Sequence, residues 1–272
     1  MKTENNPRHQ DIVRDQFTRT AEIFGSYAVA HRVGDAELLA LMVHASRSDR
    51  AVDLATGPGT LALRFASQVR WICGLDLTPA ILERGKRSAA EQGLSNLNFA
   101  IGDANALPFA EGALDIAVTS FSLHHMPDPA RVIGEMARVV KRGGRVGVLD
   151  IYVPEDPRVA ETSNRIERFR DASHTRTLAR SEFKSIFAAS GLRVTASEVR
   201  DDQDSFDHWL LRGGKKRGDA GYDAARQLLE TTFADDSAGF HPRFAPLAPG
   251  EIGSIPDIQI VHTKFYIAGE KL

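Results

Sequence analysis

The stretch AVDLATGPGTLALRFA, from Ala51 to Ala66, contains a short apolar run, a loop with two glycines and then a helix-like pattern of apolar residues. Glycine loses more conformational freedom on folding than other residues, so two glycines in a tight turn indicate that something approaches the backbone closely. With Ala62, the pair Gly57 and Gly59 also matches the loose dinucleotide pattern G-x-G-x-x-A. The stretch therefore predicts a ligand-binding loop between a strand and a helix.

Short apolar stretches alternate with helical patterns along the chain from this loop. The predicted strands are 50–55, 69–76, 97–101, 114–121 and 145–153, and the predicted helices are 61–68, 79–92 and 129–140. Near-continuous apolar strands separated by helices are typical of a parallel sheet covered on both faces. We expect an α/β fold with a doubly wound, mostly parallel, Rossmann-like sheet, in which ligands bind past the carboxyl ends of the strands.

The segments outside this core read differently. Residues 8–45 predict a helical cap interrupted at Gly25 and Gly34, and 156–172 and 181–190 predict further helices, the second capped by Ser181. We expect a sixth strand at 194–199, a helical insertion at 204–256 and an antiparallel edge strand at 258–268, where apolar residues alternate. We interpret 1–272 as one domain, with 50–153 as its cofactor-binding core and 154–185 and 204–256 as substrate-covering segments.

Composition narrows the function classes. A formal net charge of −2 over 272 residues gives no reason to expect nucleic acid or an anionic membrane as a partner. The single cysteine, Cys73, supplies neither an internal disulfide nor a thiolate cluster for a metal, so we expect a cytoplasmic protein without a metal site. No segment has the length and apolar character of a signal peptide core or a membrane span.

Acidic residues mark one rim of the predicted sheet. Asp53 lies in the first strand, and Asp76 and Asp103 end the next two strands. Asp76 stands where a dinucleotide fold places its ribose-binding acid, so a dinucleotide-dependent oxidoreductase is one interpretation. The loop has no adjacent arginine or lysine to assist a pyrophosphate, and a third acid suits an adenine amine better. The residues alone leave both interpretations open.

Four stretches carry a resemblance to a known family. AVDLATGPGTLAL, GLDLTPAILERGKR, IGDANALPFAEGALDIAVTSFSLHHMPDP and VVKRGGRVGVLD occur in the order and spacing of class I S-adenosylmethionine-dependent methyltransferases. They most resemble the ubiquinone/menaquinone-biosynthesis methyltransferases (type 11) and their small-molecule relatives. The matched part runs from Arg50 to Asp150, over a third of the chain.

The resemblance implies S-adenosyl-L-methionine as the cofactor and gives roles to individual residues. The loop around the methionine part would comprise Asp53, Gly57, Pro58 and Gly59, with Ala55 replacing the usual first glycine, as some relatives also have it. Asp76 would bind the ribose hydroxyls, and Leu77, Asp103 and Ala104 would contact the adenine. Ser120 and Phe121 would lie beneath the sulfonium, and Phe24 and Tyr27 would form a lid.

Such an enzyme would move a methyl group by in-line displacement to an O, N or C atom of a small, partly apolar molecule. The candidate bases are His124, His125 and His174, and the candidate substrate contacts are His174, Arg176 and Trp209. Competing interpretations are structural: one histidine of the doublet caps the turn near Asp128 while the other packs, and Trp209 anchors the insertion.

Several acceptors are disfavoured. SFSLHH stands where amino-group methylases of nucleic acids have [DNS]-P-P-[YFW], and Cys73 lies inside a strand rather than at the rim. A small-molecule acceptor and no nucleic acid are therefore expected. The insertion after Asp204 is open to two interpretations, a lid and the interface of a homodimer. A non-methylating S-adenosylmethionine-binding protein also remains an alternative.

Overall fold

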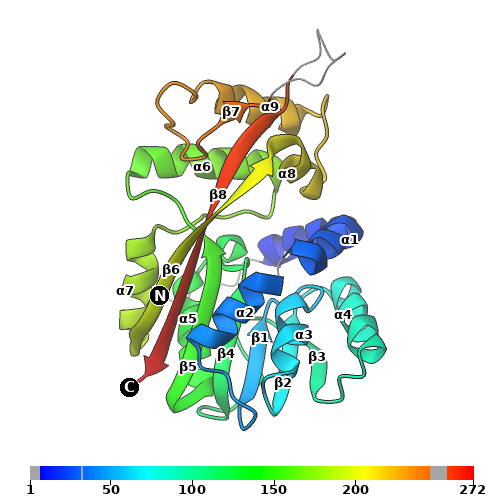
Figure 1. Ribbon diagram of the computed structural model, residues 1–272, viewed down its shortest axis with the longest axis vertical. Helices are drawn as coiled ribbons and strands as arrows, with labels where there is room; N and C mark the ends of the chain where they lie inside the picture. The colour runs from blue at the N-terminus through cyan, green and yellow to red at the C-terminus, as the bar shows by residue number, and fades with distance from the viewer. Residues whose placement is uncertain (1–6, 32, 246–255) are drawn as a thin grey trace.

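The computed structural model describes residues 7–31, 33–245 and 256–272, with side chains of the first range described from 9 to 22. Within these residues, an eight-stranded sheet runs through the molecule in the order β3-β2-β1-β4-β5-β8-β6, with β7 paired to β8 (Figure 1). The five strands from β3 to β5 are parallel to one another. The strand bounds are β1 Arg50–Leu54, β2 Trp71–Asp76, β3 Leu97–Ile101, β4 Leu114–Ser120, β5 Val140–Ile151, β6 Leu192–Ser205, β7 Arg243–Phe244 and β8 Ile258–Lys271.

Helices cover both faces of the sheet, which confirms the doubly wound α/β prediction. One apolar cluster joins the sheet to α2 (Val33–Met42), α3 (Thr60–Ala66) and α4 (Pro79–Glu91). A second cluster on the other face includes side chains of α5 (Pro129–Val139) and α7 (Arg180–Ala189). Because both faces are buried, the strands of the core are apolar almost throughout.

A smaller layer lies beyond the carboxyl ends of the parallel strands (Figure 1). There α6 (Pro157–Arg170), α8 (Phe206–Arg212) and α9 (Ala220–Glu230) pack around the extended ends of β6 and β8. Their apolar cluster includes Phe206, Trp209 and Tyr222. The N-terminal helix α1 (Pro7–His31) lies beside the same edge of the sheet. This arrangement places covering elements directly above the rim at which ligands of α/β sheets bind.

The last strand is antiparallel as predicted, but its predicted edge position is wrong. β8 lies between β5 and β6, so β6 forms that edge of the sheet. β6 runs for 14 residues, and most of its side chains are exposed or only partly buried, as edge strands allow. The alternation that suggested an edge reflects a strand whose two faces are buried to different degrees.

Two helix boundaries also differ from the predictions. The backbone of α1 continues through Gly25, and Gly34 lies inside α2, so neither glycine interrupts a helix. Ser181 does not cap α7, because the Glu182 carboxylate accepts the backbone N–H of Ala179 at 2.9 Å and the Ser181 hydroxyl donates to Glu155 at 2.6 Å. In the part of the chain that is described, no helix is long and apolar enough to span a bilayer.

Candidate functional site

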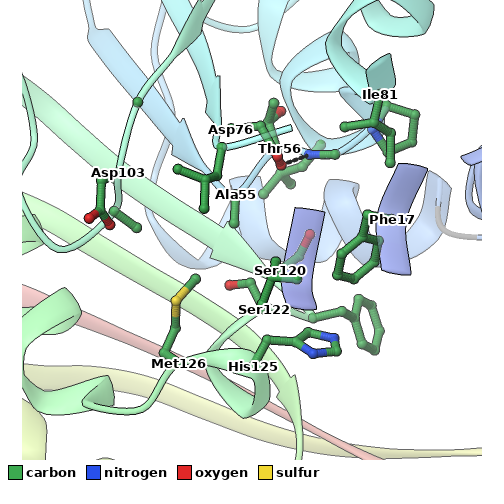
Figure 2. A pocket seen from close by; sticks show the side chains of 18 of the residues that line it. Phe17, Ala55, Thr56, Asp76, Ile81, Asp103, Ser120, Ser122, His125 and Met126 are labelled. Carbon is green, nitrogen blue, oxygen red and sulfur yellow. Dashed lines mark hydrogen bonds between the residues drawn. The ribbon is translucent and has the colours of Figure 1, made fainter. Parts of the chain in front are cut away.

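A large cavity lies at the carboxyl ends of β1, β2, β3 and β4, where the strand order reverses between β1 and β4. Its empty volume is about 1190 Å³, the part open to solvent included. Figure 2 shows Asp76, Asp103, Ser120 and His125 around this one space. Ten residues singled out in the sequence line it: Ala55, Gly57, Pro58, Asp76, Leu77, Asp103, Ala104, Ser120, Phe121 and His125.

The glycine loop turns through an unusual backbone conformation. Gly57 and Gly59 have φ angles of 56° and 82°, and Ala55 also has a positive φ, 49°. A side chain on Gly59 would place its Cβ 2.8 Å from the Phe99 ring, so glycine is required there by packing as well as by φ. Gly57 carries no side chain into the cavity, which leaves its backbone open to a ligand.

Asp53 supports this loop from below and does not line the cavity. Its Oδ2 accepts the Thr56 hydroxyl at 2.5 Å and the backbone N–H of Ala62 at 3.1 Å, which ties β1 to the start of α3. Burial raises the pKa of Asp53 to about 7, although both hydrogen bonds oppose that rise. The carboxyl group is therefore a structural clamp for the loop.

Asp76 and Asp103 end neighbouring strands and face the cavity. The Asp76 carboxylate accepts the backbone N–H of Gly57 at 2.9 Å and that of Thr78 at 2.8 Å. Burial raises the pKa of Asp76, and the two backbone bonds act against that rise. Asp103 accepts Gln10 Nε2 of α1 at 2.9 Å, so the N-terminal helix reaches across to the third strand.

A second cavity, with an empty volume of about 860 Å³, adjoins the first. Phe17, Phe121 and His125 line both, so these three side chains form the wall between them. The second cavity is rich in ion pairs: Arg170 with Glu167 at 3.4 Å, Arg212 with Asp204, and Lys264 with Asp202. Trp209 and Ile151 add apolar surface to its lining.

The candidate histidines form one group of neighbouring rings. The ring centroids of His124 and His125 are 4.2 Å apart, and those of His124 and His174 are 5.6 Å apart. The doublet belongs to a single 3-10 turn, η1 (Leu123–His125), and His174 belongs to the segment that follows α6. Thr175 joins these parts, because its N–H and hydroxyl both donate to the His124 carbonyl, at 2.9 and 2.8 Å.

Each histidine has a different partner and a different charge preference. His124 Nδ1 donates to Asp150 at 2.6 Å; burial opposes the charged imidazole, but Asp150 outweighs burial and raises the pKa of His124. Burial and the neighbouring His124 lower the pKa of His125 to about 4. His174 Nε2 contacts Asn164 Oδ1 at 2.8 Å, and burial lowers its pKa.

The structure separates the sequence candidates by position. His125 lines both cavities, His124 and Trp209 line only the second, and His174 and Arg176 line neither. Arg176 is exposed and pairs with Glu182 at 2.7 Å. Neither histidine of the doublet caps a turn at Asp128; the Asp128 side chain itself caps α5. The side chains of Phe24 and Tyr27 lie outside the described residues.

Several residues in or near the two cavities escaped the sequence analysis. Gln10 and Phe17 belong to a helix whose contact with the rim no local pattern reveals. Asp150 had a usable signal, since it lies near the end of the predicted strand 145–153, at the same rim as Asp76 and Asp103. Asp171 and Ser173 had a weaker one, because Asp-x-Ser often forms a turn in which the aspartate accepts the backbone N–H two residues later, as it does here at 2.8 Å.

The chain is similar in sequence and structure to known methyltransferases. A family model described as "Methyltransferase domain" matches residues 51–144. The uncharacterized methyltransferase YcgJ of Bacillus subtilis is 32% identical over 198 residues, which cover 73% of this chain and 78% of that protein. Its crystal structure superposes with a TM-score of 0.77 at 29% identity, over 88% of this chain and 98% of that one.

More distant structures share the fold. A putative methyltransferase from Bacillus halodurans has a TM-score of 0.75 at 22% identity and covers 88% of this chain and 99% of that one. A geranyl diphosphate C-methyltransferase from Streptomyces coelicolor, solved with S-adenosyl-L-homocysteine, has a TM-score of 0.60 at 18% identity. It covers 88% of this chain and 78% of that one. Together with the YcgJ match, the glycine loop and the rim acids, these likenesses show that the chain belongs to the class I S-adenosylmethionine-dependent methyltransferases.

Proposed function

We propose that the first cavity holds S-adenosylmethionine and that the second holds the methyl acceptor, a small molecule. The observation that carries this proposal is the wall of Phe17, Phe121 and His125, which both cavities share. Because the two cavities adjoin at these side chains, a methyl donor in one and a nucleophile in the other would lie next to each other. The same arrangement does not favour a dinucleotide-dependent oxidoreductase, and the family relationship does not favour it either.

The adenosine half of the cofactor fits the rim acids. Asp76 and Asp103 follow adjacent strands, where Asp76 pairs in register with Ile101. Asp76 would accept the ribose hydroxyls, and Asp103 would accept the adenine amine. Leu77 and Ala104 line the cavity beside these acids and would contact the adenine ring.

The methionine half fits the glycine loop. Thr60 follows the loop and lines the cavity, and its Oγ1 is buried without a hydrogen-bond partner among the described residues. A buried hydroxyl in this state costs free energy, which a ligand carboxylate or ammonium group would recover. The bare backbone at Gly57 leaves room for that group to approach.

Bound S-adenosylmethionine supplies a methyl group on positively charged sulfur, activated for displacement. The protein must align the acceptor with that group and exclude water, and alignment of this kind contributes roughly 7–11 kcal/mol in favourable cases. Phe121 is held for this by its backbone, whose N–H donates to the Leu149 carbonyl at 2.8 Å. Phe17 of α1 covers the opposite side and would exclude water from the reacting atoms.

The lining of the second cavity indicates the character of the acceptor. Trp209, Ile151 and the two shared phenylalanines suit an apolar ring or chain, and the ion-paired acids and bases suit polar substituents. Most of those charges are already paired within the protein, so the proposal is a partly apolar small molecule of low net charge. Transfer to O, N or C remains compatible with the lining alone.

Calorimetric titration with S-adenosylhomocysteine and, separately, with NADH tests the cofactor half of the proposal. We expect saturable binding of S-adenosylhomocysteine and none of NADH; binding of NADH alone would restore the oxidoreductase interpretation. Transfer of radiolabelled methyl from S-adenosylmethionine to a panel of small phenols, enols, amines and thiols tests the acceptor half. Binding without transfer to any member would favour a non-methylating S-adenosylmethionine-binding protein.

A further inference from the structure

His125 is fixed at the junction of the two cavities by contacts on three sides. Its backbone N–H donates to the Ser122 carbonyl at 3.0 Å, and its own carbonyl accepts His9 Nε2 at 2.7 Å. The edge of its ring packs against Phe17, with ring centroids 5.1 Å apart and an angle of 83° between the planes. The imidazole therefore has one orientation relative to both cavities.

A buried hydrogen-bond relay reaches His125 from the segment after α6. Its Nδ1 lies 3.0 Å from the Ser173 hydroxyl, which in turn lies 2.6 Å from Oδ1 of Asp171. An ionised carboxylate accepts hydrogen bonds and donates none, so the single hydroxyl proton of Ser173 points to Asp171. The hydroxyl oxygen must then accept a proton from Nδ1 of His125. This relay fixes the tautomer with hydrogen on Nδ1 and a free lone pair on Nε2.

The groups around the relay favour this state. Oδ1 of Asp171 accepts both the hydroxyl and the backbone N–H of Ser173, at 2.6 and 2.8 Å, and Arg170 adds positive charge that favours the ionised carboxylate. Burial, and then the neighbouring His124, lower the pKa of His125 to about 4, which keeps its imidazole neutral near pH 7. Among the described residues, Nε2 of His125 has no hydrogen-bond partner, and the residue is 7% exposed.

We propose that Nε2 of His125 takes a proton from the methyl acceptor, that Asp171 and Ser173 are positioning residues for it, and that the acceptor carries a phenol or enol hydroxyl. This inference rests on the proposed function. A neutral amine presents its lone pair without help, and a thiol ionises readily, whereas a hydroxyl gains a strong nucleophilic oxygen only as its proton leaves. A base built into the wall between donor and acceptor therefore fits an O–H group better than an amine or a thiol.

The step balances without a further reactant. The acceptor oxygen forms a bond to the methyl carbon as that carbon's bond to sulfur breaks, and the bonding pair passes to sulfur. The O–H proton goes to Nε2 of His125, which becomes positively charged and is stabilised through Ser173 by Asp171. The products are a methyl ether and S-adenosylhomocysteine, and the proton later passes to solvent.

Nitrogen-15 NMR of histidine-labelled protein tests the relay without an acceptor. We expect His125 to show hydrogen on Nδ1 and a bare Nε2 near neutral pH. Ser173→Ala should shift that tautomer, and Ser181→Ala should not, although it also removes a hydroxyl-to-carboxylate contact of 2.6 Å, here at the surface. Hydrogen on Nε2 in the parent protein, or an unchanged signal in Ser173→Ala, would overturn the positioning role.

Methyl transfer to the panel tests the acceptor class. We expect transfer to hydroxyl members, a kcat lowered roughly 100-fold or more in His125→Ala, partial rescue of that variant by added imidazole, and a lowered kcat with unchanged KM in Ser173→Ala. Transfer to amines or thiols alone, or to no hydroxyl member, would overturn the class. Titration of every variant with S-adenosylhomocysteine separates the two hypotheses. If the protein binds S-adenosylhomocysteine but fails these tests, His125 is not the base. If it does not bind S-adenosylhomocysteine, the proposed function itself is wrong.

Discussion

His124 Nδ1 lies 2.6 Å from Oδ1 of Asp150, and the two side chains are 8% and 1% exposed. This pair joins the turn after β4 to the end of β5, next to His125 in the chain. Asp150 also accepts the backbone N–H of His124, at 3.3 Å. One carboxylate thus sets both the charge of His124 and the position of the turn that carries His125.

Replacement of Asp150 by Asn should lower the free energy of unfolding by about 3–5 kcal/mol, because it leaves one partner of a buried ion pair uncompensated. The pKa of His124 is raised in the folded protein above its ordinary value of 6.5. The stabilisation is therefore complete below pH 6.5 and is lost as the pH rises through the pKa of His124 in the folded protein. Urea denaturation at a series of pH values should show the largest deficit on the acid side.

The more exposed pair of His241 and Asp236 provides a control, since its side chains are 63% and 27% exposed. Asp236→Asn should cost less than about 1 kcal/mol. A deficit in Asp150→Asn that is equally small, or one that grows with pH, would show that Asp150 does not hold a charged His124.

Asp76→Ala tests the cofactor site. The Asp76 carboxylate faces the first cavity, and a hydrogen bond to a charged group is worth about 1.5–3 kcal/mol, so affinity for S-adenosylhomocysteine should fall roughly 10- to 150-fold. Calorimetry measures this directly. Asp201→Ala removes an exposed carboxylate from β6 and should leave the affinity unchanged. Equal affinities in the two folded variants would show that Asp76 does not bind the ligand.

Local signals were sufficient to predict from the sequence that Gly57, Asp76 and Asp103 lie around one cavity. Gly57, Asp76 and Asp103 each stand next to the end of an apolar strand, and parallel strands bring such positions together. The relay was not predictable in this way. His125 and Ser173 are 48 residues apart, and their contact depends on how the segment after α6 folds back over η1. The position of β8 also depended on tertiary pairing, because alternation alone does not distinguish an edge strand from a strand next to the edge.

The backbone at Ala55 leads to a prediction about stability. Its φ of 49° lies in the left-handed region, which costs a residue with a side chain about 1–2 kcal/mol, whereas glycine adopts it freely at an entropic cost of about 0.5–1 kcal/mol. Ala55→Gly should therefore raise the free energy of unfolding by up to about 1 kcal/mol. Gly57→Ala, at a φ of 56°, should lower it by a similar amount. Urea denaturation midpoints measure both.

Gly134 is the matched control for these substitutions. It lies inside α5, where an added Cβ would meet no atom within 4 Å, so Gly134→Ala should stabilise the protein by about 0.5–1 kcal/mol. The same change of residue then has opposite signs at Gly57 and Gly134. Destabilisation by Ala55→Gly would show that the Ala55 side chain contributes packing that outweighs its backbone strain.

Asp53 offers a test of burial through the pH dependence of folding. Its pKa rises from 3.8 to about 7 on folding, with burial as the main cause. Between these values the folded protein holds a proton that the unfolded chain releases, so the group favours folding most at low pH. The contribution falls by roughly 1.4 kcal/mol per pH unit as pH rises through this range. Asp53→Asn keeps an acceptor for Thr56 and Ala62 but does not titrate.

The free energies of unfolding of the parent and Asp53→Asn should therefore diverge in favour of the variant as pH rises from about 4 to 7. Asp115→Asn is the control, because the bonds from Lys141 and Arg50 outweigh burial and lower the pKa of Asp115 below 3.8. The contribution of Asp115 to stability is lost only on the acid side of that value. The difference in free energy of unfolding between Asp115→Asn and the parent should therefore stay constant over the same pH range. A constant difference for Asp53→Asn as well would mean that Asp53 is ionised beneath the glycine loop, with a positive group or water offsetting its burial.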